Sequence, residues 1–178
     1  MTRLLYQVAA TCAVLSLAAT AGAGVARAQI GGQRAFSFLN LPTSAKLAGL
    51  GGVNVSSRDA DGTMFYGSPA LLNADMDGRL ALGYVDYLSD IRQATAAYVF
   101  NTKQAGRFGL GLTYLSYGKF EQTDAAGNVT GEFSVNEYAL SVADSYTSGS
   151  LTVAGTLKLG VSGIAGNHSV AALADVGG

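Results

Sequence analysis

The sequence predicts an all-β fold: an antiparallel transmembrane β-barrel, here an incomplete N-terminal portion with about six strands after a short helical hatch segment. Three observations predict it. From residue 79 onward, side chains alternate with the period of two that strands have. One face of each strand is large and apolar, while the other is small or polar and carries Glu137 and Lys158. The strands are about ten residues long with aromatic ends, which is typical of membrane-spanning strands and exceeds the roughly five or six residues of a globular strand.

The N-terminus has the pattern of a secretory signal peptide over residues 1–28. Arg3 gives a basic start, an apolar run follows over residues 8–23, and the segment ends in an A-x-A cleavage pattern. We expect cleavage after Ala28. A membrane anchor is the alternative, but threonines and glycines interrupt the run and no second apolar stretch of spanning length follows. The sequence therefore predicts export to the cell outer membrane.

Composition argues against several classes of function. The only cysteine, Cys12, lies inside the signal, so the exported chain would have no thiol and no disulfide. The chain has 11 Lys and Arg against 12 Asp and Glu, and removal of Arg3 and Arg27 leaves a net charge of about −3. No basic patch indicates a nucleic-acid partner. Many small residues and the absence of Trp are typical of all-β chains.

Residues 29–78 are expected to form the hatch. In "PTSAKLAG", Pro42 suits the first position of a short helix, and Gly49 or Gly51 can end that helix with a positive φ. Gly52 then allows a sharp bend or close packing against other backbone.

A second helical turn is expected just before the first strand. Ser68 can cap it, Pro69 can begin it, and residues 70–72 complete it. Both helical pieces could pack into the mouth of a barrel, where small inward side chains leave space.

Residues 79–178 are the predicted incomplete barrel. Six segments carry the alternating pattern: 79–88, 91–100, 107–118, 135–144, 151–161 and 168–177. Residues 101–106 and 147–150 would form short periplasmic turns, and residues 118–132 a longer outer loop. Because an open sheet leaves unpaired edges in lipid, we expect these strands to belong to a longer barrel.

Particular residue types have expected roles within the strands. A glycine inside a strand often marks a bulge, and the candidates are Gly83, Gly155 and Gly160. An interfacial aromatic belt explains the tyrosines on the apolar faces, namely Tyr84, Tyr98, Tyr114 and Tyr138.

The sequence contains only weak matches to motifs for metal binding, cofactor binding or catalysis. Two acidic turns mimic a calcium loop, but Tyr84 and Ser68 occupy the twelfth positions, where a Glu is required. Weak calcium binding by these turns stays open. Residues 49–52 (GLGG) follow no strand and fail as a dinucleotide fingerprint. His168 stands alone in an expected loop, without a catalytic partner. We predict no enzyme, no metal, no cofactor and no catalytic small-molecule substrate.

One stretch of the chain is similar to a known family. It reads Phe38-Leu39-Asn40-Leu41-Pro42, then Ser44-Ala45, Gly51-Gly52 and Asn54, and, after an acidic loop, Ser68-Pro69-Ala70-Leu71-Leu72. Residues 35–72 thereby resemble the N-terminal region of the PorQ family of outer-membrane proteins of the type IX secretion system, and more loosely PorV and the FadL-like barrels. Ser68 stands where the family has Asn, a mild departure because both residues cap helices well.

The resemblance implies a FadL-like barrel of about fourteen strands with its hatch in the lumen. It further implies a component of type IX protein secretion that scaffolds or anchors the surface machinery for cargo processing and attachment. The partners would be outer-membrane lipid and a PorZ-like surface protein. The structural or gating candidates are Phe38, Asn40, Pro42, Ser44, Gly51, Gly52, Asn54, Ser68 and Pro69. The alternatives are a FadL-like channel for hydrophobic compounds and a soluble secreted sandwich.

Overall fold

The computed structural model of the chain describes residues 36–102, 106–164 and 166–178. The predicted signal peptide, its cleavage after Ala28 and residues 29–35 of the predicted hatch lie outside the described residues. Among the helices that are described, none has both the length and the apolar character needed to cross a membrane.

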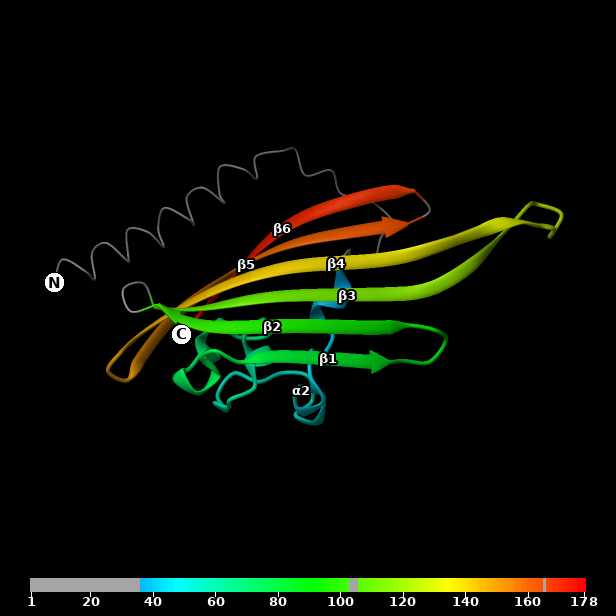
Figure 1. Ribbon diagram of the computed structural model, residues 1–178. Coiled ribbons are helices and arrows are strands. Elements are labelled where there is room, and N and C mark those ends of the chain that lie inside the picture. Colours follow the sequence, from blue (N-terminus) through cyan, green and yellow to red (C-terminus); the bar gives the residue numbers. More distant parts are fainter. Residues whose placement is uncertain (1–35, 103–105, 165) are drawn as a thin grey trace. The chain divides into compact units, whose positions relative to one another are not determined.

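Six strands form one antiparallel sheet in chain order, so each strand pairs with the next (Figure 1). They are β1 (Leu80–Asp86), β2 (Arg92–Thr102), β3 (Gly106–Thr123), β4 (Val129–Ser148), β5 (Leu151–Ile164) and β6 (Asn167–Gly177). The prediction of an all-β chain with six alternating strands is confirmed. Neighbours in sequence pair through short connections because antiparallel strands need only a tight turn between them.

The two central strands are much longer than predicted. The expected outer loop, residues 118–132, is mostly strand, because β3 continues to Thr123 and β4 begins at Val129. An extra residue on β3 between Ser116 and Lys119 breaks the period of two, which is why the alternation ended there in the sequence. The β3–β4 hairpin therefore reaches beyond the other strands (Figure 1).

Two smaller predictions about the strands were wrong. The ladder keeps its register at Gly83, Gly155 and Gly160, so these glycines mark no bulge. His168 is not in a loop: it is the second residue of β6 and lies opposite Gly163.

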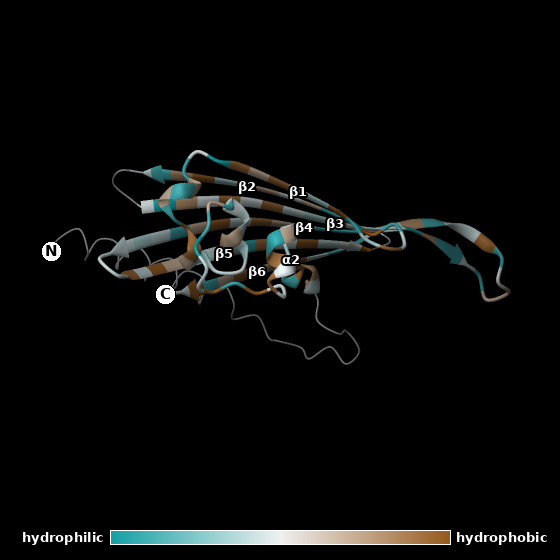
Figure 2. Ribbon diagram, turned by 90° about the horizontal axis from the view of Figure 1, so that it is seen from below, coloured by the Kyte–Doolittle hydropathy of each residue, from teal (hydrophilic) through white to brown (hydrophobic). Residues whose placement is uncertain are grey.

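The two faces of the sheet differ as the alternation predicts. The outward face keeps large apolar side chains exposed, with Leu82 at 74% and Leu112 at 49%. The inner face is small or polar and buried, and it includes Gln93, Thr95, Ala97, Thr113, Glu137, Ala139, Ser141, Ala143, Thr156 and Lys158. Alternating hydrophilic and hydrophobic residues are visible along the strands in Figure 2.

Short helices precede the sheet. They are η1 (Ser37–Asn40), α2 (Ala45–Gly49), η2 (Gly62–Tyr66), η3 (Pro69–Leu71) and η4 (Ala74–Met76). We call residues 36–78 the hatch. Its apolar side chains form a core against the inner face of the sheet, in which Phe65 and Met76 are fully buried beside Val99 and Ala143. The hatch thus supplies the apolar volume that the inner face of the sheet lacks.

The first helix of the predicted pair begins later than expected. Pro42 lies outside α2, which starts at Ala45 because the Ser44 hydroxyl accepts a hydrogen bond from the backbone N–H of Leu47 at 3.2 Å. Gly51 ends the helix with φ +86°, and Gly52 N–H donates to the carbonyl oxygen of Leu47 at 2.9 Å. Of the two candidate stops, Gly51 is the one used.

The second predicted turn is confirmed as η3, with Pro69 at its first position. Ser68 occupies the capping position, but its side chain makes no capping hydrogen bond, so this part of the prediction was wrong. The fixed φ of Pro69 is enough to start one turn without the cap.

Candidate functional site

Three glycines on the inner face make room for aromatic rings of the hatch. A Cβ added at Gly109 would lie 2.9 Å from the ring of Phe65, and one added at Gly111 would lie 2.6 Å from the ring of Tyr66 and 2.5 Å from its hydroxyl oxygen. A Cβ at Gly160 would lie 2.8 Å from Phe36. Real Cβ atoms do not approach other atoms so closely, so only glycine allows these rings to lie this close to the strands.

Tyr66 is held by the sheet through its hydroxyl. It stacks on Phe65, with 4.7 Å between ring centroids, and its hydroxyl donates toward the carbonyl oxygens of Ala96 at 2.6 Å and Leu112 at 3.1 Å. Burial raises the pKa of Tyr66 to about 12, against the opposing effect of its hydrogen bonds. The hydroxyl therefore stays a donor at every physiological pH.

Lys158 of β5 fastens the same part of the hatch. Its ammonium donates to the backbone carbonyl oxygen of Tyr66 at 3.0 Å and pairs with the carboxylate of Asp175 on β6 at 2.6 Å. The residue is only 9% exposed. A buried ammonium is tolerated because it has both an opposite charge and a carbonyl acceptor.

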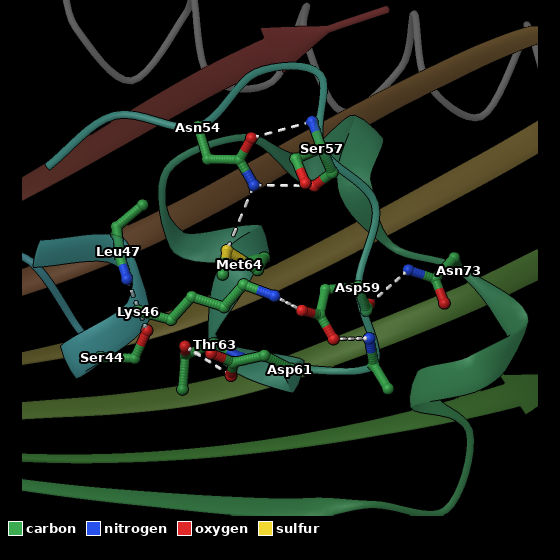
Figure 3. A network of polar contacts seen from close by, with 11 residues as sticks. Ser44, Lys46, Leu47, Asn54, Ser57, Asp59, Asp61, Thr63, Met64 and Asn73 are labelled. Carbon is green, nitrogen blue, oxygen red and sulfur yellow. Dashed lines mark hydrogen bonds and ion pairs between the residues drawn. The ribbon is translucent and has the colours of Figure 1, made fainter. Parts of the chain in front are cut away.

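Polar contacts give the hatch its internal shape (Figure 3). The side chain of Asn54 donates to the carbonyl oxygen of Ser57 at 2.7 Å and accepts from its backbone N–H at 2.9 Å. Lys46 pairs with Asp59, and Asn73 donates to the backbone carbonyl oxygen of Asp59 at 2.7 Å. These contacts tie α2 to the segment that leads into η2.

We expect Asn54→Ala to lower the free energy of unfolding by about 2 kcal/mol, because it removes the hydrogen bonds by which the buried Asn54 side chain holds the backbone of Ser56 and Ser57. Thermal unfolding in detergent would measure this. Asn40→Ala is the matched control: Asn40 is exposed, and its truncation should cost less than about 0.5 kcal/mol. Equal losses in the two variants would show that the Asn54 contacts do not stabilise the hatch.

The residues singled out from the sequence fall into separate places. Phe38 is buried in a second apolar cluster with Leu115 and Ala139. Pro42 contacts Gly52, where an added Cβ would lie 3.7 Å from the proline ring. Ser44, Gly51 and Asn54 shape α2 and the loop after it, Pro69 packs beside Gly177, and Asn40 is exposed. The set therefore shapes the hatch but does not converge on one point.

An open apolar cavity of about 460 Å³ lies between η1, the β1–β2 connection and the middle of β3. Its lining includes Phe38, Leu41, Ile91, Leu115 and two tyrosines, Tyr87 and Tyr117. The tyrosine hydroxyls turn to buried polar groups: Tyr87 donates to the Gln93 side chain at 2.8 Å and Tyr117 to Glu137 at 2.7 Å. The cavity thus has apolar walls and polar groups beside it.

The acidic turns use their carboxylates locally. Asp61 accepts from the backbone N–H of Thr63 at 2.9 Å, and Asp77 accepts from the backbone N–H of Asn101 at 2.7 Å. In the described part of the chain, no group of three or more His, Cys, Asp or Glu side chains could hold a metal ion.

Sequence reasoning missed the residues that seat the hatch: Phe65, Tyr66 and the glycines beneath them. A signal was present, because Gly109 and Gly111 occupy successive inner positions of one strand. The alternation shows that these positions lack side chains, but it does not show which distant ring fills the space.

Comparison of the chain with known protein families, with curated proteins and with solved structures finds no match.

Proposed function

We propose that the chain is part of an outer-membrane β-barrel that serves type IX protein secretion, with its lumen closed by the hatch. In this role it scaffolds the surface machinery that processes and attaches cargo. One observation carries the proposal: the outward face of the sheet is apolar and exposed, while its polar inner face is filled by the chain's own N-terminal segment. A soluble sandwich would require the opposite arrangement of faces.

The position of aromatic residues on the outward face supports a membrane-embedded sheet. Aromatic pairs bound the apolar zone, with Phe100–Phe108 at one end (5.6 Å between centroids) and Tyr114–Tyr138 at the other (4.9 Å). From Phe108 to Tyr114 the strand advances about 20 Å, or about 15 Å along the membrane normal at a typical tilt, so both aromatic pairs fit within the ~25 Å apolar band of outer-membrane barrels.

The seated hatch favours a scaffold over a conduit. Phe65 and Tyr66 occupy the inner face, and Lys158 holds the backbone beside them. A lumen filled in this way leaves the outer surface and the projecting hairpin for interactions. The type IX assignment itself rests on the PorQ-like motif of residues 35–72, and a PorZ-like surface protein is the partner that the motif suggests.

A charge on the outward face tests the membrane placement. We expect Leu112→Arg to reduce the stability of the folded, membrane-inserted chain by about 3 kcal/mol, since Arg on a lipid-facing strand costs roughly 2–4 kcal/mol near the bilayer centre. Folding into lipid vesicles, titrated with urea, would measure it. Gln122→Arg, beyond the apolar zone, is the control and should be nearly neutral. A soluble sheet would tolerate both substitutions equally.

Disruption of the gene in its source organism tests the secretion role. Cargo should be lost from the surface or left unprocessed in the medium, while uptake of hydrophobic compounds stays normal. Normal secretion in the disrupted strain would refute the proposal.

The second candidate is a channel for hydrophobic compounds. The apolar cavity beside η1 favours it, because its size and lining suit a small apolar molecule. In that case the disrupted strain would secrete normally and take up hydrophobic compounds poorly.

A further inference from the structure

The end of the β3–β4 hairpin is a free two-stranded arm, which we define as residues 117–134. β2 pairs with β3 only as far as Ser116, and β5 pairs with β4 only from Val135. Lys119–Thr123 and Val129–Ser134 therefore pair only with each other. Each has one edge whose backbone groups have no neighbouring strand in the described part of the chain, and such an edge is a template for a further strand.

The arm is built to hold its shape. Phe120 and Phe133 face each other across the strands, with 5.5 Å between ring centroids, and Lys119 pairs with Glu132 at 3.0 Å. At the tip, Asp124 accepts from the backbone N–H groups of Ala126 (2.9 Å) and Asn128 (2.8 Å). The hydrogen bonds from Asn128 hold the pKa of Asp124 below its usual value, so the turn is fixed at neutral pH. Isolated hairpins are marginally stable, and these contacts offset that weakness.

The two faces of the arm have different chemistry. Phe120 and Phe133 share one face, and Phe120 is 44% exposed. Glu121 and Glu132 lie directly opposite each other on the other face. Like charges opposite each other in a ladder are destabilising. Lys119 neutralises one of them, and no ion pair of Glu121 occurs among the described residues.

We propose that the arm docks an extended segment of a partner protein, which adds as a third strand beside Lys119–Thr123 and alternates basic with apolar side chains. In that register the basic side chains would lie next to Glu121 and relieve its repulsion with Glu132. The apolar side chains would cover Phe120. The backbone of the segment would satisfy the free edge of β3, as in other cases of strand addition. This inference rests on the proposed function, because it supplies the docking element that a surface partner of the scaffold needs.

The test is site-specific photocrosslinking of the full chain in its source organism. The photoreactive residue replaces Gln122 on the arm, or Leu88 in the β1–β2 turn as the control position at the same end of the sheet. We expect a single protein adduct when the photoreactive residue is at position 122, and we expect that adduct to be absent when the residue is at position 88. Mass spectrometry of the adduct should identify an extended segment with alternating basic and apolar residues.

Charge variants decide whether the carboxylates direct the docking. E121K/E132K should lower the adduct about tenfold, E121Q/E132Q should lower it less, and Asp75→Lys, at an exposed carboxylate of η4, should leave it unchanged. Replacing the basic residues of the captured segment with Glu should restore the adduct of E121K/E132K. All variants are first checked for assembly in the outer membrane by heat-modifiable gel mobility.

Three results would overturn the proposal: no protein adduct at position 122, an adduct with lipid alone, or an adduct that the charge reversal leaves unchanged.

Failure of the proposed secretion role gives a different combination of results from failure of the docking proposal. If gene disruption leaves secretion normal while the charge-sensitive adduct persists, the secretion role fails and the docking arm stands. If disruption abolishes secretion but E121K/E132K secretes normally without any adduct, the arm fails and the secretion role stands.

Discussion

Gly111→Val should detach the hatch from the sheet and lower the free energy of unfolding by about 4 kcal/mol. An added Cβ would overlap the Tyr66 ring, so the ring must leave the strand, and its hydroxyl then loses its acceptors on Ala96 and Leu112. Overpacking typically costs about 1–3 kcal/mol, and the lost buried hydrogen bonds add a similar amount. Trypsin cleavage after Arg58 should accelerate more than about a hundredfold, because proteolysis follows the population of the open state.

Gly155→Ala is the matched control for this substitution. Gly155 lies within β5, and an added Cβ there would lie 3.6 Å from its nearest neighbour, the carbonyl oxygen of Asp175, which is an ordinary contact. Its cleavage rate should stay within about threefold of that of the unmodified chain. If Gly111→Val behaves like this control, the hatch does not depend on its seat at Gly111.

Lys158→Met should lower the free energy of unfolding by about 3 kcal/mol. The substitution keeps the length of the side chain but removes the donor to the Tyr66 carbonyl oxygen and leaves Asp175 without its cation. A buried acceptor that loses a charged donor costs up to about 3 kcal/mol, here at the Tyr66 carbonyl oxygen. The Asp175 side chain is 44% exposed, so water replaces much of its lost cation and it adds little. Urea titration in detergent, followed by tyrosine fluorescence, would measure the loss.

Lys119→Met separates the effect of burial from that of charge. Lys119 also pairs with a carboxylate, Glu132, but its side chain is 78% exposed against 11% for Lys158. Exposed ion pairs contribute about 0–1 kcal/mol, so this variant should unfold almost normally. Equal effects of the two substitutions would mean that Lys158 does not fasten the hatch.

The all-β architecture with six antiparallel strands followed from the sequence, because side chains alternate along each strand and one sequence is enough to show this alternation. In β3, for example, large apolar side chains occupy one set of alternate positions (Leu110, Leu112 and Tyr114). Small or polar residues occupy the other set (Gly109, Gly111 and Thr113), so the two faces could be assigned before any contact was known. The local helix signals were nearly as informative: Pro69 starts its turn and Gly51 ends its helix, although Ser44 rather than Pro42 starts the first helix.

Only the tertiary structure decided what fills the inner face and how far the central hairpin extends. Tyr66 meets Gly111 and Lys158 meets the Tyr66 carbonyl oxygen across large separations in sequence, and no local period encodes such contacts. The arm was hidden because one extra residue after Ser116 shifts the phase of the alternation, so its strands did not continue the pattern. The sequence by itself determined which side of each strand is apolar, because that depends on neighbours along the chain. The position of the hatch against the sheet depends on how side chains from distant parts of the sequence fit together, and only the tertiary structure determines which of them are neighbours.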